Sequence, residues 1–210
     1  MLKNKIKLAV MLLMFCAAAA FAELTDILFQ PVVMSIENMP MHEINLKVGF
    51  DFNGNCDLNE TIGGVDGTAL NSGNNASFAA EYYKYFNEYA SAGVGVSAQM
   101  PRRLGDLSGN FGFAPVYIAL KLRSWPQEPG MYGYAVGQLG YNFFYGDSSF
   151  NDNFKSKKDG FYYGIGFGIV YNAFLAEAIF SVNNGEVEDK FDNKTNIDYE
   201  KWTVSIGCKL

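Results

Sequence analysis

The chain has 210 residues, and its 22 acidic residues outnumber its 16 basic ones, which gives a net charge of −6. This length suits a single domain, and the acidic balance argues against binding nucleic acid, which requires a basic surface. Beyond the N-terminal region no apolar run is long enough for a transmembrane helix. A mean hydropathy of −0.01 does not exclude a membrane, because membrane-spanning strands alternate apolar with polar residues.

Residues 1–22 are predicted to be a secretory signal peptide. Three lysines stand among the first seven residues, an apolar run covers 8–20, and Ala20 and Ala22 form a small-x-small cleavage site. We therefore expect cleavage after Ala22. The alternative is a lipoprotein signal that ends at Cys16, but Phe15 stands where such a signal needs a small residue. Residues 23–41 are interpreted as a periplasmic lead-in, although 31–36 could add a strand.

From residue 42 onward the chain alternates apolar residues with small or polar ones in eight stretches. The clearest lies within 161–171, where one face reads Tyr163, Ile165, Phe167, Ile169 and Tyr171 and the other is mainly glycine. A strict period of two indicates a strand with two unlike faces. Strands are expected at about 42–52, 76–86, 90–100, 113–123, 131–145, 161–171, 174–183 and 197–210, and the facing of 131–145 is ambiguous. Each is long enough to cross a membrane at the tilt of a barrel.

The links between these strands are alternately short and long. The short ones are 87–89, 124–130 and 172–173; the long ones, rich in Asn, Asp, Gly and Ser, are 53–75, 101–112, 146–160 and 184–196. Alternate links lie at the same end of an up-and-down barrel, and outer membrane barrels have short periplasmic turns and longer external loops. The pattern predicts an all-β, eight-stranded antiparallel up-and-down transmembrane barrel over residues 42–210, with both ends on the periplasmic side.

The apolar face of each strand is expected to contact lipid, and the small and polar face to fill the narrow interior. Charged residues fall on that second face, and buried charges need partners. We hypothesise an interior ion-pair network of Lys47, Glu81, Lys121, Arg123 and Glu177, with Lys121 and Arg123 nearer the periplasmic end. The alternative is that these groups are hydrated and only fill space.

Aromatic residues gather near both ends of the predicted strands, as two girdles at the membrane–water interfaces would require. One group is Tyr82, Tyr83, Tyr85, Phe86 and Tyr89 with Trp125, Tyr171 and Phe174; the other is Phe143, Phe144, Tyr145, Phe161, Tyr162 and Tyr163. The competing interpretation is a soluble lipocalin-like barrel, in which the apolar face would point inward.

No catalytic, cofactor or metal site is predicted. The only histidine, His42, lies at the periplasmic end of the first strand, whereas the acyl-transfer enzymes known among small outer membrane barrels act at the outer leaflet. The segment 51–57 has oxygen-bearing residues at alternate positions, but its glycine and its missing twelfth-position Glu do not fit a calcium loop. Cys56 and Cys208 should lie at opposite ends of the barrel, too far apart for a disulfide.

The chain resembles the outer membrane β-barrel superfamily of OmpA, OmpX and OmpW types. The resemblance covers residues 42–210 and includes the last strand, 199–210, which is similar to the family's assembly signal although Leu210 replaces the terminal Phe and Cys208 takes another aromatic position. It implies location in the outer membrane of a diderm bacterium, contact with outer membrane lipid, and insertion by the β-barrel assembly machinery with periplasmic chaperones.

The function expected from this resemblance is a non-enzymatic structural or surface-interaction role, such as adhesion or envelope integrity, through loops that meet an unknown extracellular ligand. The alternative is a porin-like narrow channel or a conduit for hydrophobic solutes of the OmpW type. Apolar residues lining the lumen would favour the conduit, whereas Lys47, Glu81 and Glu177 favour a plugged interior.

Overall fold

The computed structural model describes residues 42–58, 70–72, 74–103, 110–124, 131–147, 154–189, 192 and 194–210. The expected signal peptide, its cleavage residues Ala20 and Ala22, and the lead-in 23–41 lie outside the described residues. The described residues form no helix long and apolar enough to cross a membrane.

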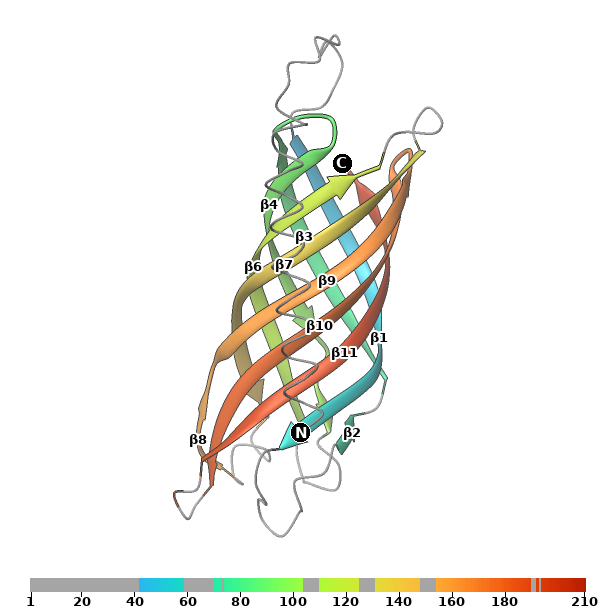
Figure 1. The fold of residues 1–210 in the computed structure, drawn as a ribbon. Coiled ribbons are helices and arrows are strands. Elements are labelled where there is room, and N and C mark those ends of the chain that lie inside the picture. The colour runs from blue at the N-terminus through green and yellow to red at the C-terminus, as the bar shows by residue number, and fades with distance from the viewer. Residues whose placement is uncertain are drawn as a thin grey trace, which may run out of the picture. The chain divides into compact units, whose positions relative to one another are not determined.

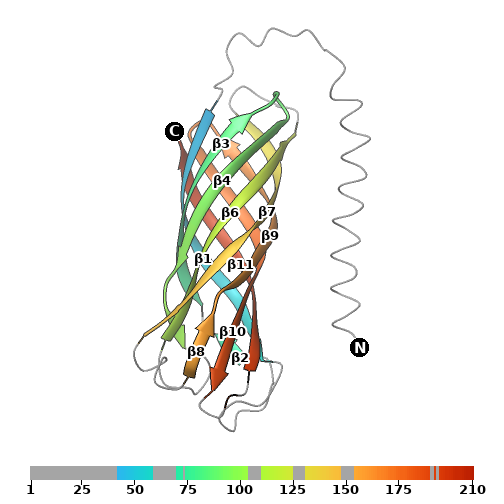
Figure 2. The ribbon, with the colours of Figure 1, turned by 90° about the vertical axis from the view of Figure 1, so that its left-hand side faces the viewer.

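Eight long strands form a closed antiparallel barrel (Figure 1), which confirms the predicted fold. They are β1 His42–Leu58, β3 Asn75–Tyr85, β4 Ala90–Gln99, β6 Asn110–Arg123, β7 Met131–Gly146, β9 Gly160–Tyr171, β10 Phe174–Asp189 and β11 Lys194–Lys209. The short strands β2 Leu70–Ser72, β5 Arg102–Arg103 and β8 Phe154–Lys158 pair with β1, β6 and β10. Consecutive long strands are neighbours, and the pairing of β1 with β11 closes the barrel. Figure 2 shows the wall formed by β3, β4 and β6.

The links between β3 and β4 and between β9 and β10 are tight turns at the same end of the barrel. Between β9 and β10, Asn172 has φ of 55°, a left-handed conformation that asparagine tolerates. Between β3 and β4, the Asn87 side-chain oxygen accepts hydrogen bonds from the backbone N–H groups of Tyr89 and Ala90 at 2.9 and 2.8 Å. We call this the turn end of the barrel, and the opposite end the loop end.

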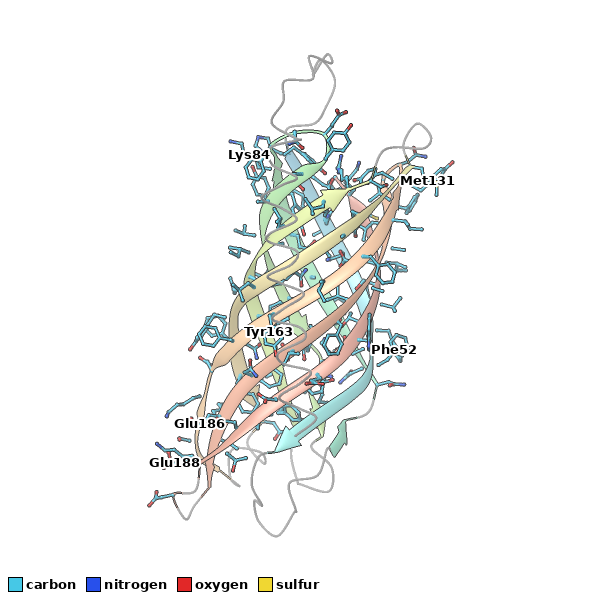
Figure 3. The ribbon with its side chains drawn as sticks, viewed as in Figure 1. Phe52, Lys84, Met131, Tyr163, Glu186 and Glu188 are labelled. Atoms are coloured by element: carbon cyan, nitrogen blue, oxygen red, sulfur yellow. The ribbon has the colours of Figure 1, made fainter. Side chains whose placement is uncertain are left out.

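The strands extend further toward the loop end than the sequence predicted. β1 continues to Leu58, while β10 and β11 remain paired as far as Glu188 and Lys194, so parts of the predicted loops 53–75 and 184–196 are strand. In these extensions the side chains still alternate between the two faces, but here the apolar ones point inward and the charged ones outward. Val187 and Ile197 are fully buried inside, whereas Glu186 and Glu188 point outward (Figure 3).

The polarity of the barrel is inverted relative to a soluble protein. Large apolar side chains are exposed along the outside of every long strand, for example Val48, Val94, Ile118, Leu139, Phe167 and Val204. Charged and polar side chains are buried inside. The ambiguous strand is also resolved: Tyr134, Val136 and Gln138 on β7 point inward, and Leu139, Tyr141 and Phe143 point outward.

Aromatic side chains do lie outward near both ends, but the two predicted girdles contain fewer residues than expected. Tyr82, Phe86, Tyr171 and Phe174 are exposed at the turn end, and Tyr141, Phe143, Phe161 and Trp202 are exposed toward the loop end. The prediction was wrong for Tyr83, Tyr85, Phe144 and Tyr162, whose side chains lie in the lumen because they share the inward parity of their strands. Trp125 lies outside the described residues.

The cysteines occupy opposite ends of the barrel, as expected. Cys208 is free and exposed, and its backbone lies opposite Leu46, whereas Cys56 lies opposite Tyr199 near the loop end of β1.

Candidate functional site

Charged side chains fill the lumen in three layers along the barrel. The middle layer has Lys47 of β1 at its centre. Its Nζ donates hydrogen bonds to Glu81 Oε1 of β3 at 2.7 Å and to Glu177 Oε1 of β10 at 2.5 Å. All three residues are at most 5% exposed. One lysine therefore joins two carboxylates that come from different sides of the barrel.

Neutral side chains from the facing wall complete this middle layer. Tyr117 of β6 donates to Glu81 Oε1 at 2.8 Å, and Gln138 of β7 donates to the same oxygen at 3.1 Å. Tyr134 of β7 donates to Glu177 Oε2 at 2.9 Å. Because these donors come from β6 and β7, the hydrogen-bonded layer spans the lumen. Buried carboxylates that accept several such bonds are far better compensated than isolated ones.

A second layer lies nearer the turn end and is built around Glu43 of β1. Lys121 Nζ is 2.7 Å from Glu43 Oε1, and Arg123 is 2.9 Å from Glu43 Oε2. Tyr85 also donates to this carboxylate. The Lys121 ammonium lies 3.9 Å from the ring centroid of Tyr83, a cation–π contact that occupies the space between the turn-end and middle layers.

A third layer lies toward the loop end, around Asp51 of β1. Lys201 of β11 and Arg102 of β5 form ion pairs with Asp51 at 2.7 and 3.0 Å. Thr203 and Ser77 donate hydrogen bonds to Asp51 Oδ1 at 2.8 and 3.1 Å. Two cations and two hydroxyls therefore surround a single buried carboxylate.

A small polar cavity of about 40 Å³ separates the middle layer from the loop-end layer. Lys47, Lys201, Ser77, Gln99, Ser181 and Thr203 are among its lining residues. At about 10–15 Å³ for each water, it has room for about three water molecules. The cavity suits hydration of the surrounding polar groups, and it is far smaller than the pockets that bind small organic molecules.

Between the Asp51 layer and the loop end, packed aromatic rings fill the lumen. Phe113 of β6 stacks on Phe144 of β7 with ring centroids 4.9 Å apart, and Phe111 and Tyr199 meet the same cluster. Arg102 lies 4.6 Å from the ring centroid of Tyr199, and this contact connects the aromatic cluster to the Asp51 layer. Phe111, Phe113 and Tyr199 are fully buried.

The structure brings the five residues of the hypothesised network into two groups. Lys47, Glu81 and Glu177 meet in the middle layer, and Lys121 and Arg123 meet on Glu43 nearer the turn end. Sequence reasoning left four buried charged residues out of the network: Glu43, Asp51, Arg102 and Lys201. Glu43 and Asp51 occupy the same alternate positions on β1 as Lys47, and Lys201 those of Ser205 on β11, so the alternation that places Lys47 on the inner face places these residues there as well. Arg102 was assigned to a loop.

His42 and the segment 51–57, whose oxygen-bearing residues partly resemble a calcium loop, also have defined positions. His42 faces outward, where its ring stacks on Tyr82 and its Nδ1 lies 2.5 Å from Tyr82 Oη. The segment 51–57 continues β1, and Asp51 already has two cationic partners. In the part of the chain that the structure describes, no three His, Cys, Asp or Glu residues gather as a metal-binding group.

The sequence matches no family model and no curated protein. Among solved structures, the chain is similar to Neisserial surface protein A, with a TM-score of 0.53, 10% identity, and coverage of 83% of this chain and 100% of that one. It is also similar to the outer membrane protein OprG of Pseudomonas aeruginosa (TM-score 0.48, 15% identity, 84% and 99% covered). A third similar structure is Ail of Yersinia pestis, the attachment invasion locus protein, in complex with the heparin analogue sucrose octasulfate (0.46, 15%, 81% and 100%). At 10% identity the likeness to Neisserial surface protein A supports the fold alone, a closed antiparallel β-barrel.

Proposed function

We propose that the protein is an integral outer membrane β-barrel protein of a Gram-negative-type bacterium, with a structural or surface-interaction role exerted through its loop end. The observation that carries this proposal is the inverted polarity of the barrel, with ion pairs inside and a continuous apolar wall outside. In water such a wall would expose an apolar surface far larger than soluble monomers tolerate. In a bilayer the same wall is solvated by lipid, and barrel closure leaves no unpaired strand edge in hydrocarbon.

The filled lumen supports a structural role over transport. Charged and aromatic layers cross the interior from β1 to β7, and the cavity between two of these layers has room for only about three waters. A conduit for hydrophobic solutes would require an apolar passage, and an ion channel would require a continuous aqueous one. The arrangement of Lys47, Glu81 and Glu177 obstructs both kinds of passage.

The loop end supplies the surface for interaction in this proposal. The pairing of β10 with β11 continues past Asn183, where the pairing of β10 with β9 ends, and β8 adds a third strand. The outward face of this extension carries charged residues, including an exposed ion pair between Lys158 and Glu186 at 2.8 Å. A paired, charged sheet presents its side chains in fixed positions to molecules outside the cell. The β-barrel assembly machinery and periplasmic chaperones are the partners we propose for insertion.

Cysteine labelling in intact cells tests this placement. We would introduce Lys194→Cys at the loop end and, as the matched control, Glu88→Cys at the turn end, both in a chain with Cys56 and Cys208 replaced by Ser. A membrane-impermeant maleimide should label the Lys194→Cys protein in intact cells and the Glu88→Cys protein only after lysis. Labelling of Glu88→Cys but not Lys194→Cys in intact cells would reverse the topology, and a soluble periplasmic protein would refute the proposal.

A further inference from the structure

The lipid-facing wall over β1, β3 and β4 is not smooth but contains two shallow apolar grooves. Their volumes are about 330 and 440 Å³, and both are lined by Ala80 and Val96, so together they form one furrow. Toward the turn end the furrow is bounded by Ile44 and Tyr82, and toward the loop end by Val48 and Phe78.

The furrow exists because a small residue stands among large ones. Ala80 lies opposite Leu46 on β1 and opposite Val96 on β4. On β3 itself the next outward residues are Phe78 and Tyr82, both exposed. The missing side-chain volume at Ala80, between these two aromatic rings, leaves a depression that follows the strands. Its apolar lining suits a flexible hydrocarbon chain.

A polar group with a positive charge lies at the turn end of this furrow. His42 and Lys84 are directly opposite each other in the pairing of β1 with β3, and such neighbours have Cβ atoms about 5 Å apart. Tyr82, which lines the furrow, meets His42 Nδ1 through its hydroxyl at 2.5 Å. When Tyr82 donates this bond, His42 carries its own proton on Nε2 and presents it as a donor.

Lys84 is exposed on the outside of the barrel (Figure 3). The nearest lumenal carboxylate on the paired strand, Glu43, faces inward, where Lys121 and Arg123 already bind it. On the outer face at this end, the described residues give Lys84 no acidic ion-pair partner within 4 Å. The furrow therefore ends at a cationic side chain and an imidazole, which is the chemistry that binds a phosphate.

We propose that this furrow, with His42, Tyr82 and Lys84 at its end, is a binding site for one anionic glycerophospholipid of the periplasmic leaflet. The acyl chain lies along Ala80, and the phosphodiester contacts Lys84 and the Tyr82–His42 pair. The inference rests on the proposed membrane placement, which brings the turn end to the periplasmic side.

Charge favours a lipid over a second copy of the chain as the occupant. Two copies in one membrane share the same orientation, so a symmetric contact across the furrow would bring the turn ends together. Lys84 of each copy would then approach the other, and like charges repel in a partly desolvated contact. An anionic lipid brings the complementary charge to the same place.

Native mass spectrometry of the full mature protein tests the site by counting retained lipids. The protein would be extracted from membranes in a mild detergent and given phosphatidylglycerol or, in parallel, phosphatidylethanolamine. The variants are Ala80→Phe, which fills the furrow, and Lys84→Gln, which removes the charge. The matched controls are Ala135→Phe on the lipid-facing side of β7 and Lys194→Gln at the loop end.

We expect one phosphatidylglycerol to remain bound to each wild-type barrel in preference to phosphatidylethanolamine. Ala80→Phe should abolish this retention, and Lys84→Gln should weaken it about fivefold, the usual contribution of one basic side chain at a membrane surface. Ala135→Phe and Lys194→Gln should retain the lipid as the wild type does.

Equal retention of both lipids, or equal loss in Ala80→Phe and Ala135→Phe, would show ordinary contact with bulk lipid and overturn the proposal. A change of oligomeric state in Ala80→Phe without loss of lipid would make the furrow a protein interface and would also overturn it. Each sample would be run boiled and unboiled on a gel, so that a barrel absent from the membrane, which refutes the proposed function, is distinguished from a folded barrel without the site.

Discussion

At the residue scale, stability of the lumen depends on charge balance around single side chains. Lys47 joins Glu81 and Glu177, and the hydroxyl of Tyr117 shares the same Glu81 oxygen. Alternation in the sequence was sufficient to place Lys47, Glu81 and Glu177 on the inner face. It could group them in one network but could not say which pairs form or which neutral side chains join them, because barrel curvature, rather than spacing along the chain, brings residues of different strands together.

Removal of the central cation should be strongly destabilising. In Lys47→Met, Glu81 and Glu177 stay buried without their ammonium partner, and breaking a buried ion pair in this way costs about 3–5 kcal/mol of unfolding free energy. Urea-induced loss of the heat-modifiable gel band in lipid vesicles measures the change. Lys47→Met combined with Glu81→Gln and Glu177→Gln should recover most of the loss, because no buried charge is then left uncompensated.

The exposed pair of Lys158 and Glu186 is the control for this prediction. Lys158→Met should leave the urea midpoint unchanged, because water and salt screen an exposed pair. A wild-type midpoint for Lys47→Met would mean that the interior charges only fill space.

Glycine at position 95 is required by a close approach within the lumen. A Cβ there would lie 2.5 Å from Cε2 and 2.6 Å from Cζ of Tyr117, the ring that holds Glu81. Gly95→Ala should therefore lower the unfolding free energy by about 1–3 kcal/mol, the usual cost of overpacking. Gly137 faces outward on β7, and a Cβ there meets nothing within 4 Å, so Gly137→Ala should be tolerated. The same urea assay compares the two variants, and equal midpoints would contradict this close packing of Gly95 against Tyr117.

At the element scale, the strands have two regions of opposite polarity. In the spanning region the apolar side chains point outward, whereas beyond it Val187, Ile197 and Tyr199 point inward. The sequence placed all eight strands because each alternates an apolar outer face with a small or polar inner one. It missed the extensions of β10 and β11 because the outward residues there, such as Glu186, Glu188 and Lys194, are charged, and the alternation no longer matches the pattern of the spanning region.

The aromatic cluster at the loop end should stabilise these extensions locally. Phe113 stacks between Phe144 and Tyr199, so Phe113→Ala leaves a cavity that costs about 3–5 kcal/mol. Hydrogen exchange of backbone amides measures the effect. Amides of β10 beyond Val182, and those of the β11 residues paired with them, should exchange faster. Amides of the strand segments around the middle layer should keep their protection. Uniformly faster exchange over the whole barrel would contradict a separate loop-end cluster.

At the scale of the whole molecule, the distinction between a soluble and a membrane barrel depends on which face points outward. The sequence predicted an apolar outer face from the charges on the opposite face, and the exposed Ile118, Phe167 and Val204 confirm it. The identity of an external ligand could not be predicted, because the links that would bind it are rich in Asn, Asp, Gly and Ser and carry no recognisable chemical motif.

The central claim is that the chain forms a closed barrel in the outer membrane, and heat-modifiability tests it most directly. Outer and inner membrane fractions and the periplasm would be run on one denaturing gel, each boiled and unboiled. We predict a band in the outer membrane fraction that migrates at a different position when unboiled, because the closed barrel resists detergent until it is heated. A protein found in the periplasmic fraction with identical mobility in both samples would contradict the account.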